Sequence, residues 1–374
     1  MQIAKEMIET VTEAQQEALE SGDVLLAAET LFEIINGLPP LSSQVKPRSR
    51  WLATLSRLFA EQDVDWPLGH EVRLLAAVAQ TAFAAREVTS ALTASEQAVG
   101  RAIELGDLPL EALVRARRLA WLSGTDHGEA AAEAQALDAV WQRLGEAQRS
   151  ADLLAEVHLA WTAWYGAKRD FVAMRKAMAS LGRLQLPVDD RVHFVAFATQ
   201  CALAQLALRT RMRVQAAQSM IDAARIAADF EADAELANLQ AALAAFAVRA
   251  GDFDSAIAHA SSALDAAQSS QAAKTHLDPW FGMPFDIAPE RDLAGVIRHL
   301  AEAALAAQES GDRTGFLVSA TGMVAFYLLA DRAPEALDAM NEAIEAVQEM
   351  NDEHASKMLR GVAEGLLRYM GMLA

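Results

Sequence analysis

The stretch that decides the fold runs from Leu243 to Leu264 and reads Leu-Ala-Ala-Phe-Ala-Val-Arg-Ala-Gly-Asp-Phe-Asp-Ser-Ala-Ile-Ala-His-Ala-Ser-Ser-Ala-Leu. Two alanine-rich segments with helical periodicity meet here at the pair Gly251 and Asp252. Glycine adopts the left-handed conformation that ends a helix without a Cβ clash, and aspartate accepts a hydrogen bond from a free N–H group of the next helix. The stretch therefore predicts a tight hairpin of two antiparallel helices.

Three other Gly-Asp pairs mark similar joints, at positions 22–23, 106–107 and 311–312. Between the joints, apolar residues recur with helical spacing, at a pitch of about 20 residues per helix. We therefore expect about 17 helices with short connections. Their ranges are roughly 1–21, 23–36, 48–61, 69–86, 88–105, 107–122, 126–145, 147–166, 168–182, 188–209, 212–228, 231–250, 252–269, 289–310, 312–330, 333–350 and 352–371.

The composition of the chain also favours an all-α fold. It has 374 residues, of which 53% are hydrophobic and 22% charged, and 81 are alanine. Helix-forming residues greatly outnumber the β-branched and aromatic residues that strands favour. A disordered chain needs a lower hydrophobic content, and a fibrous one needs far more than 19 glycines and 10 prolines. These numbers argue against a β-rich, disordered or collagen-like protein.

The deciding stretch resembles a tetratricopeptide repeat (TPR). It carries the Gly-Asp-aromatic turn of that repeat at 251–253, its small packing residues at Ala256 and Ala263, and the leucine that follows them at Leu264. Two further segments, 22–39 and 333–344, resemble the repeat more loosely. The resemblance implies a right-handed α-solenoid of TPR-like antiparallel helical hairpins, in which each hairpin buries its apolar edge by stacking on the next.

Three parts follow from this organisation. Residues 1–269 form a TPR-like helical repeat segment, residues 270–288 form a loop rich in proline and aromatic residues, and residues 289–374 form helical hairpins that continue the solenoid. Small residues let paired helices approach closely, which accounts for the high alanine content.

The net charge of −19 and the sequence pI of about 4.8 restrict the partners. Nucleic acids and anionic membranes bind clustered lysine and arginine, so we expect the chain to bind neither. The first ten residues carry acids where a secretory signal has a basic segment, and the most apolar stretch, 316–330, is shorter than the ~20 residues that span a bilayer. We expect a cytoplasmic protein.

The proline and aromatic loop is the most unusual segment. Trp280, Phe281, Met283 and Phe285 fall close together in it, and three prolines keep the chain extended. One interpretation is that these side chains contact a partner. The alternative is that the loop crosses between two solenoid segments and its aromatic side chains pack into an end of the core.

Arg209, Arg211 and Arg213 concentrate three guanidinium groups at a helix junction in an otherwise acidic chain. Such a cluster can bind a carboxylate or phosphate on a ligand, which makes it the second candidate contact site. The alternative is that the arginines compensate the dipole at a helix end and pair with Asp222 or Asp229.

A second group of arginines falls at positions 115, 117 and 118. Residues three apart share a face of a helix. We expect this stripe to be a solvated surface without a binding role.

No motif in the sequence indicates catalysis. The eight histidines include no His-Glu-x-x-His pattern, and the nearest metal-ligand pairs, Asp190 with His193 and His299 with Glu302, supply only two ligands each. No phosphate-binding glycine loop or nucleophile motif is present. We expect that the protein is not an enzyme and that it binds neither a metal nor a cofactor.

The sequence thus predicts a non-catalytic scaffold or adaptor that binds another protein or a peptide on the concave face of a TPR-like solenoid. One alternative is a ligand- or peptide-sensing component of a bacterial signalling system, and another is an unrecognised all-α enzyme. Because the chain is acidic, we expect the partner to carry some positive charge. Oligomeric state and partner identity stay open.

Overall fold

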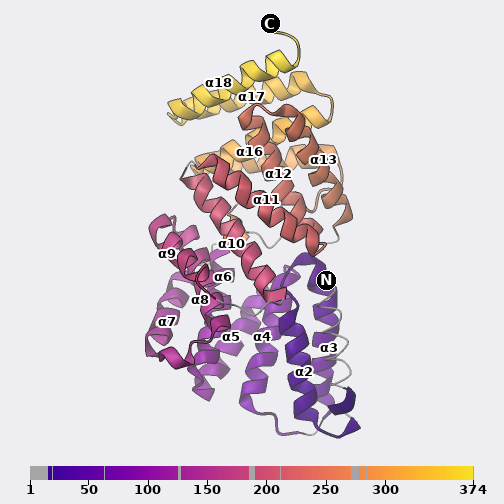
Figure 1. Cartoon of the computed structure of the whole chain (residues 1–374), viewed down its shortest axis with the longest axis vertical. Helices are drawn as coiled ribbons and strands as arrows, with labels where there is room; N and C mark the ends of the chain where they lie inside the picture. The colour runs from indigo at the N-terminus through magenta and orange to yellow at the C-terminus, as the bar shows by residue number, and fades with distance from the viewer. Residues whose placement is uncertain are drawn as a thin grey trace. The chain divides into compact units, whose positions relative to one another are not determined.

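The computed structural model describes residues 16–373 except 19, 63, 125–127, 185–189, 211, 271–277 and 283–284. Within this part, every regular element is helical, with 17 α-helices and two short 3-10 turns, and no strand occurs. Figure 1 shows the helices coloured along the chain. The all-α class that the composition predicts is therefore confirmed.

Contacts divide the chain into two compact units. Unit 1 comprises residues 1–202 and 276–282, and unit 2 comprises residues 203–275 and 283–374, so the division falls inside one helix, α10. The helices up to that division are α2 (Val24–Gly37), α3 (Val45–Glu61), α4 (Leu68–Ala84), α5 (Val88–Leu105), α6 (Leu108–Gly124), α7 (Ala130–Arg143), α8 (Ala151–Ala167), α9 (Phe171–Leu181) and α10 (Asp190–Arg209).

The helices that follow are α11 (Arg213–Asp229), α12 (Asp233–Ala250), α13 (Phe253–Ser269), α14 (Asp278–Phe281), α15 (Leu293–Glu309), α16 (Arg313–Leu329), α17 (Ala333–Glu349) and α18 (Glu353–Tyr369). The 3-10 turns are η1 (Ser42–Gln44) and η2 (Glu146–Gln148). The expected helix at 1–21 lies mostly outside the described residues, and the other sequence-based ranges agree with these bounds to within a few residues. The short helix α14 was not predicted, because four residues inside a proline-rich loop carry no periodic signal.

All four Gly-Asp joints form as predicted. Gly22, Gly106, Gly251 and Gly311 have φ angles of 78°, 72°, 77° and 70°. The aspartate after each glycine accepts a hydrogen bond from the backbone N–H three residues further on, at 3.0, 3.0, 3.1 and 3.2 Å. Each pair therefore ends one helix and caps the next.

Five more joints have the same left-handed residue without glycine. These residues are Arg86, Arg169, Glu231, Asp331 and Asn351, with φ between 52° and 64°. Together with the glycine joints they recur at 20-residue steps, at 231 and 251 and again at 311, 331 and 351. The pitch of about 20 residues per helix thus comes from a repeated joint.

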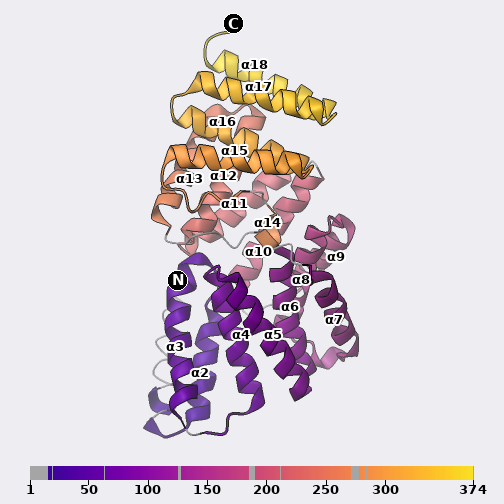
Figure 2. The ribbon, with the colours of Figure 1, turned by 180° about the vertical axis from the view of Figure 1, so that it is seen from behind.

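Within each unit, alternate helices pack against each other in addition to their chain neighbours. In unit 1, α2 packs against α4, α4 against α6, and α6 against α8. In unit 2, α12 packs against α16 and α18. Figure 2 shows α15 to α18 following one another in a stack. This is the packing of stacked antiparallel hairpins in an α-solenoid, as the sequence predicts.

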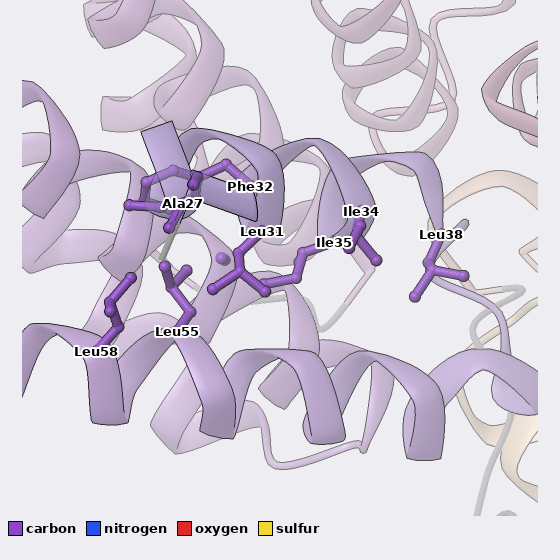
Figure 3. Close-up of a cluster of buried hydrophobic side chains, with 11 residues drawn as sticks. Ala27, Leu31, Phe32, Ile34, Ile35, Leu38, Leu55 and Leu58 are labelled. Carbon is purple, nitrogen blue, oxygen red and sulfur yellow. The ribbon is translucent and has the colours of Figure 1, made fainter. Parts of the chain in front are cut away.

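The hairpin of α2 and α3 illustrates how the stack is held together. Leu31, Ile35 and Leu55 are fully buried between the two helices, and Phe32 joins them (Figure 3). Each such side chain contributes about 1.5–3 kcal/mol of hydrophobic stabilisation. A single hairpin buries only one edge in this way, so the next helices must cover the rest.

A buried arginine ties the first three described helices together. The guanidinium of Arg48 on α3 donates to the carbonyl oxygens of Ile35, at 2.9 Å, and Leu38, and to Oε1 of Gln80, at 2.7 Å. Burial, and to a lesser degree the charge of Arg117, lowers the pKa of Arg48 to about 9. Because its main acceptors are carbonyls at the end of α2, Arg48 closes that helix end.

Among the described helices, none is both long and apolar enough to cross a membrane.

Candidate functional site

Unit 1 contains a pocket of about 490 Å³ that is lined by α2, α4, α6 and α8 and the residues just before them. Its apolar surface comes mainly from Pro109, Leu110 and Leu113 on α6 and Leu153 on α8. Leu110 and Leu113 are only half-buried, so they present apolar surface to the pocket. We call this the acidic pocket, for the charges described next.

Two basic residues of the acidic pocket already have acidic partners. Nη1 of Arg73 lies 2.6 Å from Oε1 of Glu29, and Nη2 of Arg117 lies 2.8 Å from Oε1 of Glu156. Asp107 and Asp152 add two further carboxylates to the lining. With the two glutamates that hold the arginines included, four carboxylates and two guanidinium groups lie at or beside the pocket next to half-buried leucines, which suits an apolar group that lies next to a basic one.

Unit 2 contains a smaller pocket of about 190 Å³, lined by the end of α10, the first residue of α11, and parts of α12, α16 and α18. Four arginines line it: Arg209, Arg213, Arg249 and Arg313. We call it the arginine pocket. Such a concentration of guanidinium groups runs against the net charge of the whole chain, which is −19.

Two of these arginines have carboxylate partners. Arg209 forms a two-pronged ion pair with Asp312, in which Nη2 and Oδ2 are 3.0 Å apart. Arg313 donates to the carbonyl oxygen of Met350 at 3.0 Å, and its Nη1 lies 3.8 Å from Oδ2 of Asp352. Both aspartates also cap the helices that follow them.

The other two arginines have no carboxylate partner among the described residues. Arg213 donates from Nη2 to the sulfur of Met358 at 2.9 Å. The guanidinium of Arg249 lies over the ring of Phe246, 5.2 Å from its centroid, and its buried Nε makes no hydrogen bond within the described part of the chain. Burial, followed by the charge of Arg213, lowers the pKa of Arg249 to about 10. Within the described part of the chain, neither guanidinium group is therefore balanced by a carboxylate.

The structure brings together two of the three arginines that the sequence singled out. Arg209 and Arg213 both line the arginine pocket, whereas Arg211 lies outside the described residues. Asp222 pairs with Arg225 at 3.3 Å, and the carboxylate that holds Arg209 is Asp312, 103 positions away. The expected pairing of Arg209 with Asp222 or Asp229 is thus replaced by a pairing between helices.

The aromatic side chains of the proline-rich loop are buried. Trp280 and Phe281 are 5% and 0% exposed, and Trp280 packs edge-on against Phe194 in unit 1, with ring centroids 5.5 Å apart. Phe285 is 4% exposed in unit 2. Met283 lies outside the described residues. These placements agree with the alternative interpretation, in which the aromatic residues pack into the core, and they leave little surface for a partner.

The end of this loop is also tied down by hydrogen bonds. Nδ2 of Asn238 on α12 donates to Oδ1 of Asp286 at 2.8 Å, and the N–H of Ile287 donates to Oδ1 of Asn238 at 2.7 Å. The N–H of Asp286 donates to Nε2 of His299 at 3.1 Å. No sequence pattern marks Asn238, because its partners lie almost 50 positions away.

The arginines at 115, 117 and 118 are buried and paired, so the expectation of a solvated stripe is wrong. Their side chains are only 12%, 10% and 8% exposed. Arg115 and Arg118 share the carboxylate of Glu133 on α7, at 2.9 and 3.3 Å. The network joins α6 to its neighbours, and its role is structural.

No group of three or more histidine, cysteine, aspartate or glutamate side chains in the described residues is arranged to hold a metal ion. The side chains of Asp190 and His193 lie outside that part of the structure. Nδ1 of His299 lies 3.8 Å from Oε1 of Glu290.

Comparisons with known proteins add little. No protein-family model and no curated protein matches the sequence. Among solved structures, the chain is similar to one described as a circular tandem repeat protein with novel repeat topology and enhanced subunit contact surfaces. That match has 14% sequence identity, covers 98% of this chain and 96% of the other, and has a TM-score of 0.23. The fold assignment therefore rests on the helices and their packing.

Proposed function

We propose that the protein is a non-catalytic scaffold or adaptor that binds another protein or a peptide along its row of alternate helices, as TPR-like repeats do. The observation that carries the proposal is the acidic pocket, which four successive members of this row line with half-buried leucines and carboxylates. A surface of this kind fits an extended segment that presents apolar and basic side chains.

The charge of the chain supports the choice of partner. A net charge of −19 speeds encounter with basic segments and opposes acidic ones. Arg73 and Arg117 do not cancel this preference, because each is bonded to a glutamate. The expected ligand is therefore a peptide with an apolar side chain beside lysine or arginine.

Ligand sensing is the second candidate function, and the arginine pocket favours it. A pocket of about 190 Å³ is smaller than the ~300–1,000 Å³ of drug-sized ligand sites, so it suits a small charged group. In this version of the proposal, a ligand in unit 2 regulates what the protein binds.

A selection from a displayed library of random peptides tests the scaffold proposal. We expect the protein to enrich peptides that combine lysine or arginine with a large apolar residue. Leu113→Glu, which replaces a half-buried apolar side chain of the pocket by a charged one, should reduce binding of the enriched peptides at least tenfold, because the contact with their apolar residue is lost. The matched control is Val172→Glu on α9, which is 63% exposed and outside the pocket.

Circular dichroism spectra and thermal midpoints of both variants establish that they are folded. Enrichment without any basic preference, or equal loss of binding in Leu113→Glu and Val172→Glu, would refute the assignment of the acidic pocket.

A further inference from the structure

The uncompensated charges of Arg213 and Arg249 are the feature of unit 2 that a peptide-binding scaffold leaves unexplained. Arg249 is largely buried, and its Nε has no hydrogen-bond acceptor among the described residues. Removing a cation from water without pairing it costs several kcal/mol. The chain has 51 acidic residues, but none of those that the structure describes pairs with Arg213 or Arg249. The pocket instead keeps two cations available.

Neighbouring carboxylates are already engaged. Asp312 holds Arg209 through both of its oxygens and accepts the N–H of Gly315 at 3.2 Å. Asp352 faces Arg313 and accepts the N–H of Ala355 at 3.0 Å. These two aspartates balance two of the four arginines. Arg213 and Arg249 are the two arginines of the pocket that no described carboxylate balances.

The pocket is open to solvent. Arg213 and Arg313 are exposed at its rim, whereas Arg249 is mostly buried. Its volume of about 190 Å³ is sufficient for a small oxyanion and the first atoms attached to it. An anion can therefore enter past Arg213 and reach the guanidinium of Arg249.

We propose that the arginine pocket is a binding site for a dianionic phosphate group, held by Arg213 and Arg249. Two guanidinium groups match the two negative charges of a phosphate, and the planar N–H fork of arginine fits pairs of phosphate oxygens. A carboxylate carries one charge and would leave one arginine uncompensated. Burial and the nearby charge of Arg213 lower the pKa of Arg249, and a bound anion would offset both effects.

This inference goes beyond the scaffold proposal and does not depend on it. The arginine pocket and the acidic pocket belong to different units and share no residue. Phosphate binding can therefore fail while peptide binding holds, and the reverse.

Isothermal titration calorimetry at constant ionic strength tests the site with three probes: inorganic phosphate, O-phosphoserine and acetate. We expect saturable binding of inorganic phosphate and O-phosphoserine to the full-length protein. Acetate should bind at least about tenfold more weakly, because its single negative charge can balance only one of the two guanidinium groups. Acetate binding equal to that of phosphate would overturn the assignment of a dianion.

Two variants locate the site. Arg249→Met and Arg213→Met should each weaken phosphate binding at least about tenfold. Arg213 is exposed, so its variant keeps the test valid if Arg249→Met fails to fold. The matched control is Arg225→Met on α11, whose side chain is 71% exposed and lies outside the pocket, and its affinity should be unchanged.

A fourth arm identifies the source of the phosphate. A peptide that contains phosphoserine is compared with its unphosphorylated form and with free O-phosphoserine. Tighter binding of the phosphopeptide than of O-phosphoserine supports a phosphorylated protein as the source, and equal binding supports a small phosphorylated molecule. The proposal is overturned if inorganic phosphate and O-phosphoserine show no saturable binding, if Arg249→Met and Arg213→Met bind as the wild type does, or if the unphosphorylated peptide binds equally well.

Discussion

The acidic pocket of unit 1 and the arginine pocket of unit 2 are built in the same way and have opposite charge. Even-numbered helices supply most of the lining of both, and the first residue of α11 adds Arg213 to the arginine pocket. In the acidic pocket both arginines are bonded to glutamates, whereas in the arginine pocket two of the four arginines have no carboxylate partner among the described residues. Net charge therefore describes the chain as a whole but does not describe either site. What distinguishes the pockets is whether their arginines have carboxylate partners.

The largest effect that the comparison predicts concerns a paired arginine. Arg118→Met removes one of the two buried arginines that hold the carboxylate of Glu133, in the network beside the acidic pocket. We expect the free energy of unfolding to fall by about 3 kcal/mol, because a buried charge loses a partner. Urea denaturation measures this change.

The control for that variant is Arg101→Met, whose side chain is half exposed and pairs with Glu104 on the same helix. Its urea midpoint should match that of the wild type. Equal and small changes in both variants would show that the buried network of unit 1 does not stabilise the fold, and would weaken the contrast between paired and unpaired arginines.

The second prediction concerns an arginine without a carboxylate partner, and its expected effect on stability has the opposite sign. Arg249→Met replaces an uncompensated, largely buried cation by an apolar side chain that keeps contact with Phe246. In the absence of phosphate, the free energy of unfolding should rise by about 1 kcal/mol. Urea denaturation in a phosphate-free buffer checks this, and a loss of stability similar to that of Arg118→Met would mean that Arg249 is satisfied in the folded protein.

The third prediction tests the joint next to Arg249 without changing any charge. Gly251 ends α12 with φ of 77°, and no atom lies close enough to meet an added Cβ. Gly251→Ala should therefore lower the free energy of unfolding by about 1 kcal/mol through backbone strain alone. Thermal denaturation gives the change, and an unchanged midpoint would contradict the role of the left-handed joint.

The smallest effect is expected at the other end of α12. Glu231 has φ of 52° at the joint that precedes this helix. Glu231→Gly should raise the free energy of unfolding by about 0.5 kcal/mol, because glycine adopts this conformation without strain. Opposite signs for Glu231→Gly and Gly251→Ala in the same assay would separate backbone effects from those of the arginine pocket.

The sequence predicts what is decided locally. Helix positions and the four Gly-Asp joints follow from caps and from left-handed glycines, whose effects extend over three or four residues. The five joints at non-glycine residues were not predicted individually, because arginine and glutamate rarely adopt positive φ, and asparagine and aspartate adopt it more often but not specifically. Their positions were implied only by the pitch of the helices.

Features that depend on distant residues were not predictable in the same way. Arg209 was identified as a candidate, but its partner Asp312 lies 103 positions further along the chain. Arg249 was missed altogether, since a single arginine in an alanine-rich helix looks like an exposed residue. Which charged side chains lack a partner depends on which helices pack together, and the composition of the chain does not contain that information.

The most direct test of the contrast between the pockets is the thermal midpoint of the wild type and of Arg249→Met, each with and without inorganic phosphate at constant ionic strength. A ligand that binds the folded state raises the midpoint in proportion to its affinity. We predict that phosphate raises the midpoint of the wild type and leaves that of Arg249→Met nearly unchanged. An equal shift in both proteins would contradict the assignment of free cationic charge to the arginine pocket.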